Sequence, residues 1–310
     1  MGWRAETWND RSGARGVWML VVLSSALFAH MRNVAADSIS NRVRDACIRA
    51  CNVLPDDVLA ALERAREQED SPAGRQVIEQ LIENARIARD ESVPICQDTG
   101  LALVFVQIGQ EVHITGGSLV DAINEGVRRG YHEGYLRKSV LRHPLDRVNT
   151  TENTPAVIHT EIVPGDRFRV MVAPKGGGSE NMSAARMLKP SDGAEGVRRF
   201  VVQTVREAGS NPCPPVIVGV GLGGSLEKAA LLSKKAVLRK LGESASDPVD
   251  ARLEGELLAA VNETGVGPGG LGGRVTALAV HVESYPCHIA SLPVAVTVQC
   301  HAARHADFEL

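Results

Sequence analysis

The apolar pattern of the chain changes at about Leu101, and this change decides the expected fold class. Before Leu101, apolar residues such as Ile39 and Val43 recur at helical spacing. After it, short apolar runs predict strands at 101–108, 155–163, 168–174, 215–220, 274–284 and 293–300. Helical patterns at 118–134, 192–209, 225–241 and 248–263 separate these runs. We therefore expect an α/β fold of the mixed α+β type, in which an N-terminal helical segment precedes an α/β body with mixed sheets.

Turn and cap residues mark where these elements begin and end. The pattern predicts one helix over residues 38–53. Leu54-Pro55-Asp56-Asp57 predicts the start of a second, with proline in the first turn and acids at the positive end of the helix dipole. Ser71-Pro72 opens a third helix that runs to about residue 89. Pro164-Gly165-Asp166 predicts a hairpin between two of the strands.

Composition limits the class of ligand. The chain has 310 residues, 44% of them hydrophobic, which is enough for a substantial core in two compact lobes. Its net charge of −3 gives no reason to expect nucleic acid or an anionic membrane as a partner. The 30 glycines, against only 3 Trp, 3 Tyr and 5 Phe, favour tight loops around a small polar ligand.

Residues 1–30 differ from the remainder. Arginines precede an apolar run at 16–29, which is short for a membrane span but has the shape of a signal-peptide core. The alternative is an upstream extension of the reading frame, with Met31 as the working start. Helical patterning begins soon after Met31, so we favour the extension and assign the catalytic domain to residues 31–310.

Three of the six cysteines stand in loop-like segments. Six in a chain of this length are too sparse for a disulfide scaffold, so we expect reduced thiols and a cytoplasmic protein. Cys96, Cys213 and Cys300 lie in polar or Gly/Pro-rich surroundings, from which thiolates can converge on one metal centre. Three ligands rather than four would leave one metal position open for substrate. Cys47 and Cys51 lie on an apolar helical stripe, which favours core packing.

Three glycine-rich segments, 175–181, 219–225 and 265–273, together suggest an anion site built from backbone N–H groups. Lys175 adds a positive charge to the first. The second fits G-x-G-x-x-G after a strand, but the acid about 20 residues on, Glu243, sits in a loop rather than at a strand end. Nucleotide binding is therefore the weaker interpretation.

Several of these motifs together, in this order, resemble one known family. They are the segments 94–100, 175–181, 211–224, 265–273 and 293–301. The chain resembles, over residues 31–310, the α subunit of the two-subunit iron–sulfur (class I) fumarases and L-tartrate dehydratases. The resemblance implies a [4Fe–4S] cluster held by Cys96, Cys213 and Cys300, with a fourth iron that binds substrate. Cys287, which spacing alone allows as a ligand or as half of a Cys/His pair, lies outside the family pattern.

The resemblance also implies roles for polar residues. Gln97 and Asp98 match substrate-contacting catalytic residues, and His288 matches a histidine that reaches the substrate. Arg137 matches an arginine that grips a substrate carboxylate. The glycines that match a loop donating backbone N–H groups to substrate are Gly176, Gly177 and Gly178. A dianionic substrate needs such donors rather than apolar walls.

The family's remaining substrate residues lie on a β subunit, which we expect this chain to need for activity. The leading hypothesis is hydration of fumarate to (S)-malate, and its closest rival is dehydration of L-tartrate to oxaloacetate. Outside this class, the alternatives are a glycine-loop nucleotide-binding protein and a redox or scaffold protein with a structural cluster.

Overall fold

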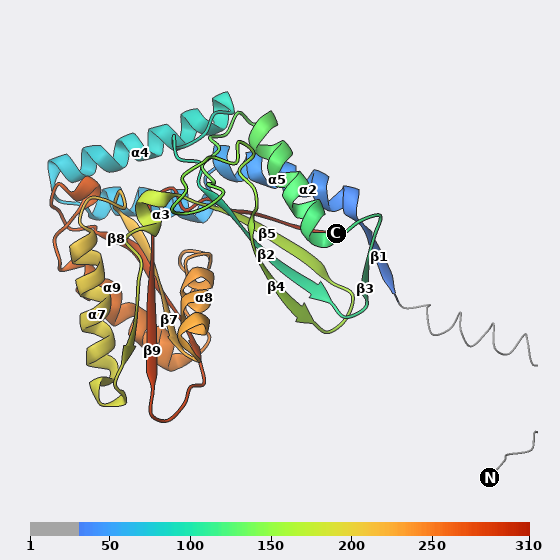
Figure 1. The fold of residues 1–310 in the computed structure, drawn as a ribbon. Coiled ribbons are helices and arrows are strands. Elements are labelled where there is room, and N and C mark those ends of the chain that lie inside the picture. Colours follow the sequence, from blue (N-terminus) through green and yellow to red (C-terminus); the bar gives the residue numbers. More distant parts are fainter. Residues whose placement is uncertain (1–30) are drawn as a thin grey trace, which may run out of the picture.

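A computed structural model describes residues 31–310 of the chain and contains two four-stranded sheets (Figure 1). The first has the order β10-β5-β2-β4, and the second has the order β6-β9-β7-β8. The strands of the first are β2 (Leu101–Gly109), β4 (Val157–Val163), β5 (Phe168–Lys175) and β10 (Ala306–Glu309). Those of the second are β6 (Ala184–Leu188), β7 (Val216–Gly223), β8 (Ala277–Tyr285) and β9 (Leu292–Gln299). Both sheets mix parallel and antiparallel pairs, so the predicted fold class is confirmed.

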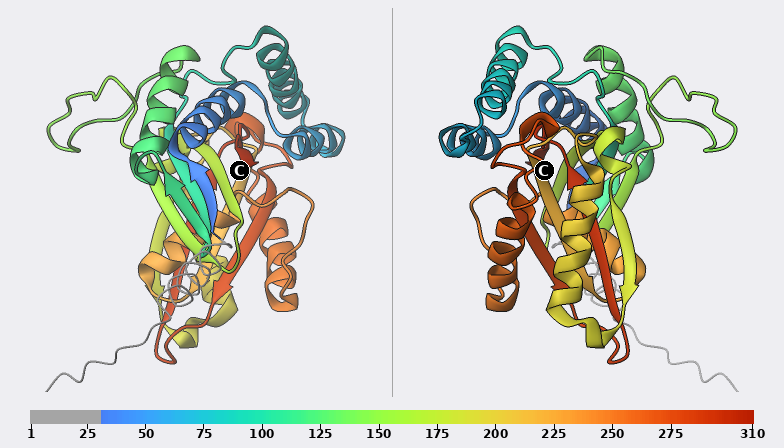
Figure 2. Two further views of the ribbon diagram at one scale, coloured as in Figure 1. Left: turned by 90° about the vertical axis from the view of Figure 1, so that its right-hand side faces the viewer. Right: turned by 90° about the vertical axis from the view of Figure 1, so that its left-hand side faces the viewer.

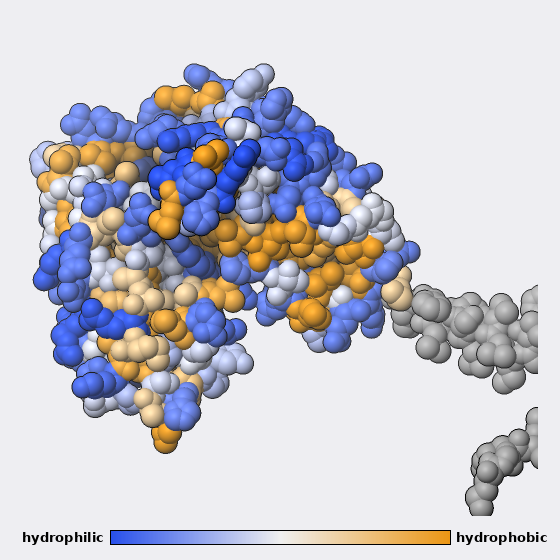
Figure 3. Space-filling model, in the orientation of Figure 1, coloured by the Kyte–Doolittle hydropathy of each residue, from blue (hydrophilic) through white to orange (hydrophobic). Residues whose placement is uncertain are grey.

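Two crossing helices cover one face of the first sheet (Figures 1 and 2). They are α2 (Ala36–Asn52) and α5 (Leu119–Glu133). A Cβ on Gly126 would lie 2.6 Å from the carbonyl oxygen of Ser40, so glycine permits the close approach of these helices. Cys47 and Cys51 are fully buried on this stripe, as predicted. Apolar residues gather over the strands on the other face (Figure 3).

The helical arm α3 (Asp56–Gln68) and α4 (Pro72–Glu91) lies across one end of both sheets (Figure 1). Ser71 caps α4, since its hydroxyl accepts a hydrogen bond from the Gly74 N–H at 3.2 Å. Leu62 and Ile78 of the arm share a core with Ile217 of β7. The three helices predicted before Leu101 are confirmed.

The second sheet is covered on both faces. Helix α8 (Leu226–Ala236) packs on one face, whereas α7 (Gly193–Ala208) and α9 (Pro248–Asn262) pack on the other. The G-x-G-x-x-G segment explains the first contact: a Cβ on Gly221 would lie 1.9 Å from the Ala229 carbonyl oxygen. These glycines therefore let α8 approach β7, and α8 ends at Ala236 rather than at the predicted residue 241.

The predicted hairpin at Pro164-Gly165-Asp166 is wrong. Strands β4 and β5 do not pair with each other, because β2 lies between them and pairs with both. The turn straddles the end of β2, where the Gly109 N–H donates to the Arg167 carbonyl at 2.7 Å and the Glu111 N–H donates to the Gly165 carbonyl at 3.0 Å. Turn residues predict where the chain reverses, but not which strand lies beside it.

The sequence patterns also missed short elements, namely the two-stranded sheet β1 (Arg32–Ala35) and β3 (Val112–Thr115), the edge strands β6 and β10, and α6 (Gly177–Glu180). These elements have four or five residues each, too few for a periodic signal. Within residues 31–310, every helix is too short or too polar to cross a bilayer. The predicted extension at residues 1–30 lies outside the described part of the chain.

Candidate functional site

The three predicted ligand cysteines come from loops at the same end of the second sheet. Cys213 precedes β7 and Cys300 follows β9, and the pairing of Ile217 with Gln299 brings these two strand ends together. Cys96 arrives from the loop between α4 and β2. Burial raises the pKa of Cys213, and the neighbouring thiols of Cys300 and Cys96 raise it further. The three loops thus place their sulfur atoms within electrostatic reach of one another.

Cys213 has an unusual backbone. Its φ of 55° lies in the left-handed region, which a residue with a side chain rarely adopts unless its surroundings hold it there. Its N–H donates to the Ser210 carbonyl at 3.0 Å, and its own carbonyl lies 2.9 Å from Nδ1 of His301. The second contact ties the Cys213 loop to the Cys300 loop.

The segment richest in glycine, 265–273, packs against the Cys213 loop. The Gly269 N–H donates to the Pro214 carbonyl at 2.8 Å, and a Cβ on Gly270 would lie 2.4 Å from the Cβ of Ser210. The three glycine segments therefore have different contacts. Gly219 and Gly221 pack under α8, whereas the segment 265–273 packs against the Cys213 loop. The segment at 175–181 contacts Asp98 through the Gly177 N–H.

Glu69 holds the chain that follows the glycine segment 265–273. No sequence pattern predicts this role. Its carboxylate is fully buried and accepts backbone N–H bonds from Ser71 at 2.9 Å, Arg274 at 2.9 Å and Val275 at 2.8 Å. Burial acts to raise the pKa of Glu69, but these donors outweigh burial and lower it. Glu69 therefore joins the helical arm to the segment that supports Cys213.

Asp98 links the Cys96 loop to the first glycine segment. Its Oδ1 accepts from the Gly100 N–H at 2.9 Å, and its Oδ2 accepts from the Gly177 N–H at 2.8 Å. Its own N–H donates to Cys96 Sγ at 3.4 Å. A Cβ on Gly176 would lie 3.2 Å from Oδ2, so the segment passes close to the carboxylate.

Lys175 differs from its expected role. Its ammonium is buried, donates to Ser179 Oγ at 2.7 Å and pairs with Glu180 at 3.4 Å. Burial lowers the pKa of Lys175 to about 8, although Glu180 acts to raise it. The Lys175 ammonium therefore holds the short helix α6 through Ser179 and Glu180 and is not available in the loop for an anion.

Arg137 and Gln97 are both exposed. The Arg137 carbonyl accepts from Thr99 Oγ1 at 3.0 Å, and its guanidinium forms no ion pair with residues 31–310. Gln97 lies with its Oε1 3.5 Å from Cys96 Sγ. Arg137 belongs to the segment between α5 and β4, which projects from the body of the protein (Figure 2). The Asn153 amide fixes the return of that segment by donating to the Gly100 carbonyl at 3.1 Å.

His288 does not lie with these residues. It is exposed in the loop between β8 and β9, at the end of the sheet where Gly223 pairs with Tyr285. Cys300 follows the opposite end of β9, whose eight residues extend roughly 23 Å at about 3.3 Å per residue. Cys287 shares the His288 loop and is likewise far from the other thiols.

Arg304 lies beside the predicted site, and no sequence pattern indicates its position. It follows Cys300 by four positions and is 2% exposed. Its Nη2 donates to the Asp98 carbonyl, whereas Nε and Nη1 have no hydrogen-bond partner. The sequence shows only an arginine near the C-terminus, which by default would be a solvated charge.

The three thiols fit a cluster better than a single ion. No group of three His, Cys, Asp or Glu side chains in the described region is close enough to hold one ion. One zinc ion would need sulfurs roughly 3.8 Å apart, since a Zn–S bond is about 2.3 Å. A four-iron cluster can bind each thiolate through a different iron, so its ligands stay further apart. Soft thiolates are also the donors that iron–sulfur clusters select.

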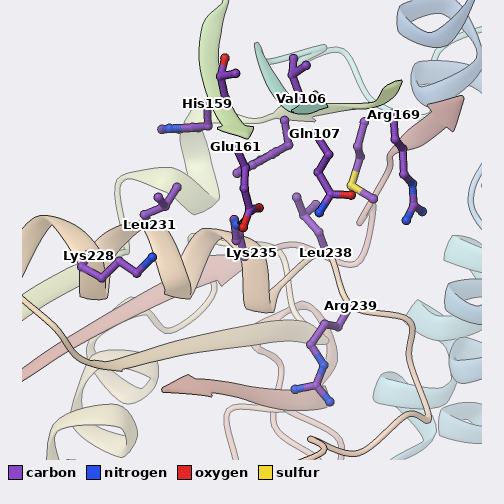
Figure 4. A pocket seen from close by; sticks show the side chains of 13 residues that line it. Val106, Gln107, His159, Glu161, Arg169, Lys228, Leu231, Lys235, Leu238 and Arg239 are labelled. Carbon is purple, nitrogen blue, oxygen red and sulfur yellow. Dashed lines mark hydrogen bonds and ion pairs between the residues drawn. The ribbon is translucent and has the colours of Figure 1, made fainter. Parts of the chain in front are cut away.

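A separate hollow of about 320 Å³ lies between α8 and the open face of the first sheet (Figure 4). It is lined by Phe105, His159 and Met171 of the sheet and by Leu231 and Lys235 of the helix. Its charges are largely paired, for example Lys235 with Glu161 at 2.9 Å. None of the predicted site residues lines it.

The sequence matches the Fumarate hydratase (Fumerase) family over residues 40–309. A protein named "Putative L(+)-tartrate dehydratase subunit alpha" from Methanocaldococcus jannaschii is 44% identical over 274 residues, covering 86% of this chain and 96% of the relative. The L(+)-tartrate dehydratase subunit alpha of Escherichia coli K12 is 36% identical over 264 residues, covering 82% and 86% respectively. The family-level resemblance is thereby confirmed, and the chain belongs to the Fumarate hydratase (Fumerase) family.

Proposed function

We propose that this chain is the α subunit of an iron–sulfur hydro-lyase that acts on a four-carbon dicarboxylate. Cys96, Cys213 and Cys300 would hold its [4Fe–4S] cluster. The proposal is supported by three loops that bring their thiols within electrostatic reach of one another, with Cys96 hydrogen-bonded to the Asp98 N–H and Asp98 to Gly177. All six cysteines are free thiols, which supports a reducing, cytoplasmic setting.

The residues around the thiols have the chemistry that hydration needs. A bound cluster with one iron free of protein ligands supplies a Lewis acid for substrate oxygens. Hydration adds a hydroxyl group to one alkene carbon and a proton to the other. Arg137, exposed and free of ion pairs within residues 31–310, would bind a substrate carboxylate, and Gln97 would contact the substrate beside it.

Asp98 is the candidate for moving a proton. Its carboxylate is oriented by two backbone N–H groups, from Gly100 and Gly177, so its position is defined before substrate binds. Because Gly177 gives its N–H to Asp98, we propose that the Gly176–Gly178 segment acts on the substrate partly through that carboxylate.

His288 would reach substrate only in another copy of the chain. The strand β9 separates it from Cys300 within one chain, so a histidine contact with substrate requires the β8–β9 loop of a second α subunit. A β subunit would supply further substrate contacts, in line with the "subunit alpha" names of the relatives. The proposed assembly therefore contains at least two α chains and a β partner.

Fumarate hydration to (S)-malate remains the first candidate reaction, given the family match. Dehydration of L-tartrate to oxaloacetate is the second, and the names of the relatives favour it. Both reactions make or break a C–O bond next to a carboxylate, so the same residues serve either.

The test is anaerobic reconstitution of the full chain with iron and sulfide, followed by assays with fumarate and L-tartrate. We expect no turnover by the chain alone, and turnover of one substrate when its native partner subunit is added. Substantial turnover without a partner would contradict the need for a β subunit. Absence of turnover of both substrates in the complete assembly would contradict the proposed reaction.

A further inference from the structure

Arg304 has an uncompensated charge in the interior of the protein. Its side chain is 2% exposed, and it forms no ion pair with any carboxylate of residues 31–310. Its Nη2 donates to the Asp98 carbonyl, which is a neutral acceptor. The Asp98 carboxylate instead accepts from Gly100 and Gly177. Two donor atoms of the guanidinium, Nε and Nη1, remain without partners.

A buried guanidinium without an ion pair destabilises the folded protein unless an anion binds beside it. Arginine stays ionised in proteins, so it cannot avoid the cost by losing its proton. A buried charge without a partner destabilises the fold. The other titratable groups near the guanidinium are Cys51, Tyr131, Cys300 and His301. Free thiols and phenols are uncharged at neutral pH in their ordinary state, and histidine carries no negative charge, so none of these groups neutralises Arg304 without a bound partner.

The position of Arg304 indicates which anion this is. It lies among three segments of the proposed site: the Asp98 carbonyl, the Gly176 backbone and the Cys300 thiol. A four-iron cluster with three thiolate ligands is an anion overall, and N–H donors near its sulfurs stabilise it. A substrate carboxylate is the competing anion for the same guanidinium.

We propose that Arg304 is the fixed counter-charge of the thiolate-bound cluster and supplies it with two N–H donors. This inference rests on the proposed function, because it requires Cys96, Cys213 and Cys300 to hold a cluster. Arg304 is then a positioning residue: it stabilises the loaded centre and makes its reduction more favourable, since a nearby positive charge favours the more negative redox state.

Stability measured with and without the cluster separates this role from a merely structural one. In Arg304→Met, the apo chain should melt at the same temperature as wild type or higher, because an uncompensated buried charge has been removed. The reconstituted variant should instead lose its cluster at least tenfold faster than wild type. Arg206→Met, on the exposed surface of α7, is the matched control and should change neither value. If Arg304→Met lowers the melting temperature of the apo chain or prevents folding, the arginine is structural and the proposal is wrong.

The reduction potential of the cluster provides the second readout. Arg304→Met should shift the one-electron reduction equilibrium at least tenfold toward the oxidised form, which is 59 mV. Arg304→Lys, which keeps the charge, should recover most of this shift. An unchanged potential together with lost binding of fumarate would assign Arg304 to substrate and overturn the proposal. Failure of the wild-type chain to assemble any cluster would overturn the proposed function itself, and this inference with it.

Discussion

Gly177 donates its backbone N–H to Oδ2 of Asp98 at 2.8 Å, across 79 positions of sequence. This one contact joins the loop that carries Cys96 to the glycine segment that follows β5. It also orients the Asp98 carboxylate, which we propose as the group that transfers a proton.

Replacing Gly177 by proline removes this donor and little else. Gly176 already has φ −67° and ψ 141°, which suit a residue before proline, and proline is tolerated at the first position of a helix such as α6. We expect Gly177→Pro to lower the free energy of unfolding by about 1.5–3 kcal/mol, the range for a hydrogen bond to a charged group. Gly177→Ala keeps the N–H and its Cβ would lie 3.8 Å from Oδ2, an ordinary contact. Equal urea midpoints for the two variants would show that the hydrogen bond contributes nothing.

Gly221 should tolerate no side chain, because α8 rests on it. The Cβ of Gly221→Ala would lie 1.9 Å from the Ala229 carbonyl and 2.7 Å from the Ser233 nitrogen, so the helix must move. We expect a loss of about 1–3 kcal/mol or more in unfolding free energy. Gly255→Ala, in α9 with nothing within 4 Å of its Cβ, is the control and should gain about 0.5–1 kcal/mol.

The same glycines give a test of the nucleotide alternative. If they serve helix packing, neither ATP nor NAD should raise the melting temperature of the wild-type chain. A clear stabilisation by either nucleotide that Gly221→Ala abolishes would restore the dinucleotide interpretation of G-x-G-x-x-G.

Glu69 should make stability depend on acid pH. Its pKa is lowered in the folded chain, so the folded state favours the ionised carboxylate. This contribution is complete above the unfolded pKa of about 4.3 and is lost as pH falls through the folded pKa. Glu69→Gln should lower the free energy of unfolding by at least about 2 kcal/mol at pH 7. Between pH 6 and pH 3.5, the free energy of unfolding should then fall less in this variant than in wild type. Urea unfolding measures both effects.

Glu79→Gln, on the exposed side of α4, is the control for that series. It should keep both the wild-type stability and the wild-type pH dependence. A wild-type pH profile in Glu69→Gln would instead assign the acid sensitivity to other carboxylates.

His288 can be tested by mixing two inactive variants. His288→Ala leaves the thiols intact, and Cys213→Ser leaves the histidine intact. If His288 serves a second copy, random pairing of the variants in a two-copy assembly should restore roughly a quarter of the wild-type activity. If it serves its own chain, every mixed assembly should stay inactive. Each variant alone, and the mixture before subunit exchange, are the controls.

The elements with strong local patterns could be predicted from the sequence, and those defined by distant partners could not. Ser71-Pro72 opens α4 because cap and proline act within one turn. By contrast, Pro164-Gly165-Asp166 is flanked by two strand patterns that look alike whether they pair with each other or with β2. Strand order depends on long-range packing, which these local patterns do not encode.

The candidate site divides in the same way. Cys96, Cys213 and Cys300 stand out because a thiol in a Gly/Pro-rich loop is conspicuous in the sequence. Glu69 and Arg304 do not, because a charged residue looks alike on a surface and in the interior until burial and partners are known. The location of His288 likewise depends on the length and direction of β9, which no motif records.

Iron content of cysteine variants tests most directly whether these three thiols form one centre. The full chain is reconstituted anaerobically, and iron, sulfide and the electron paramagnetic resonance signal are measured for Cys96→Ser, Cys213→Ser, Cys300→Ser and the control Cys287→Ser. Each of the first three should lose most of the roughly four irons that a [4Fe–4S] cluster brings, whereas Cys287→Ser should keep the wild-type amount and signal. Full iron and an unchanged signal in any of the first three variants, or loss of iron in Cys287→Ser, would contradict the proposed ligand set.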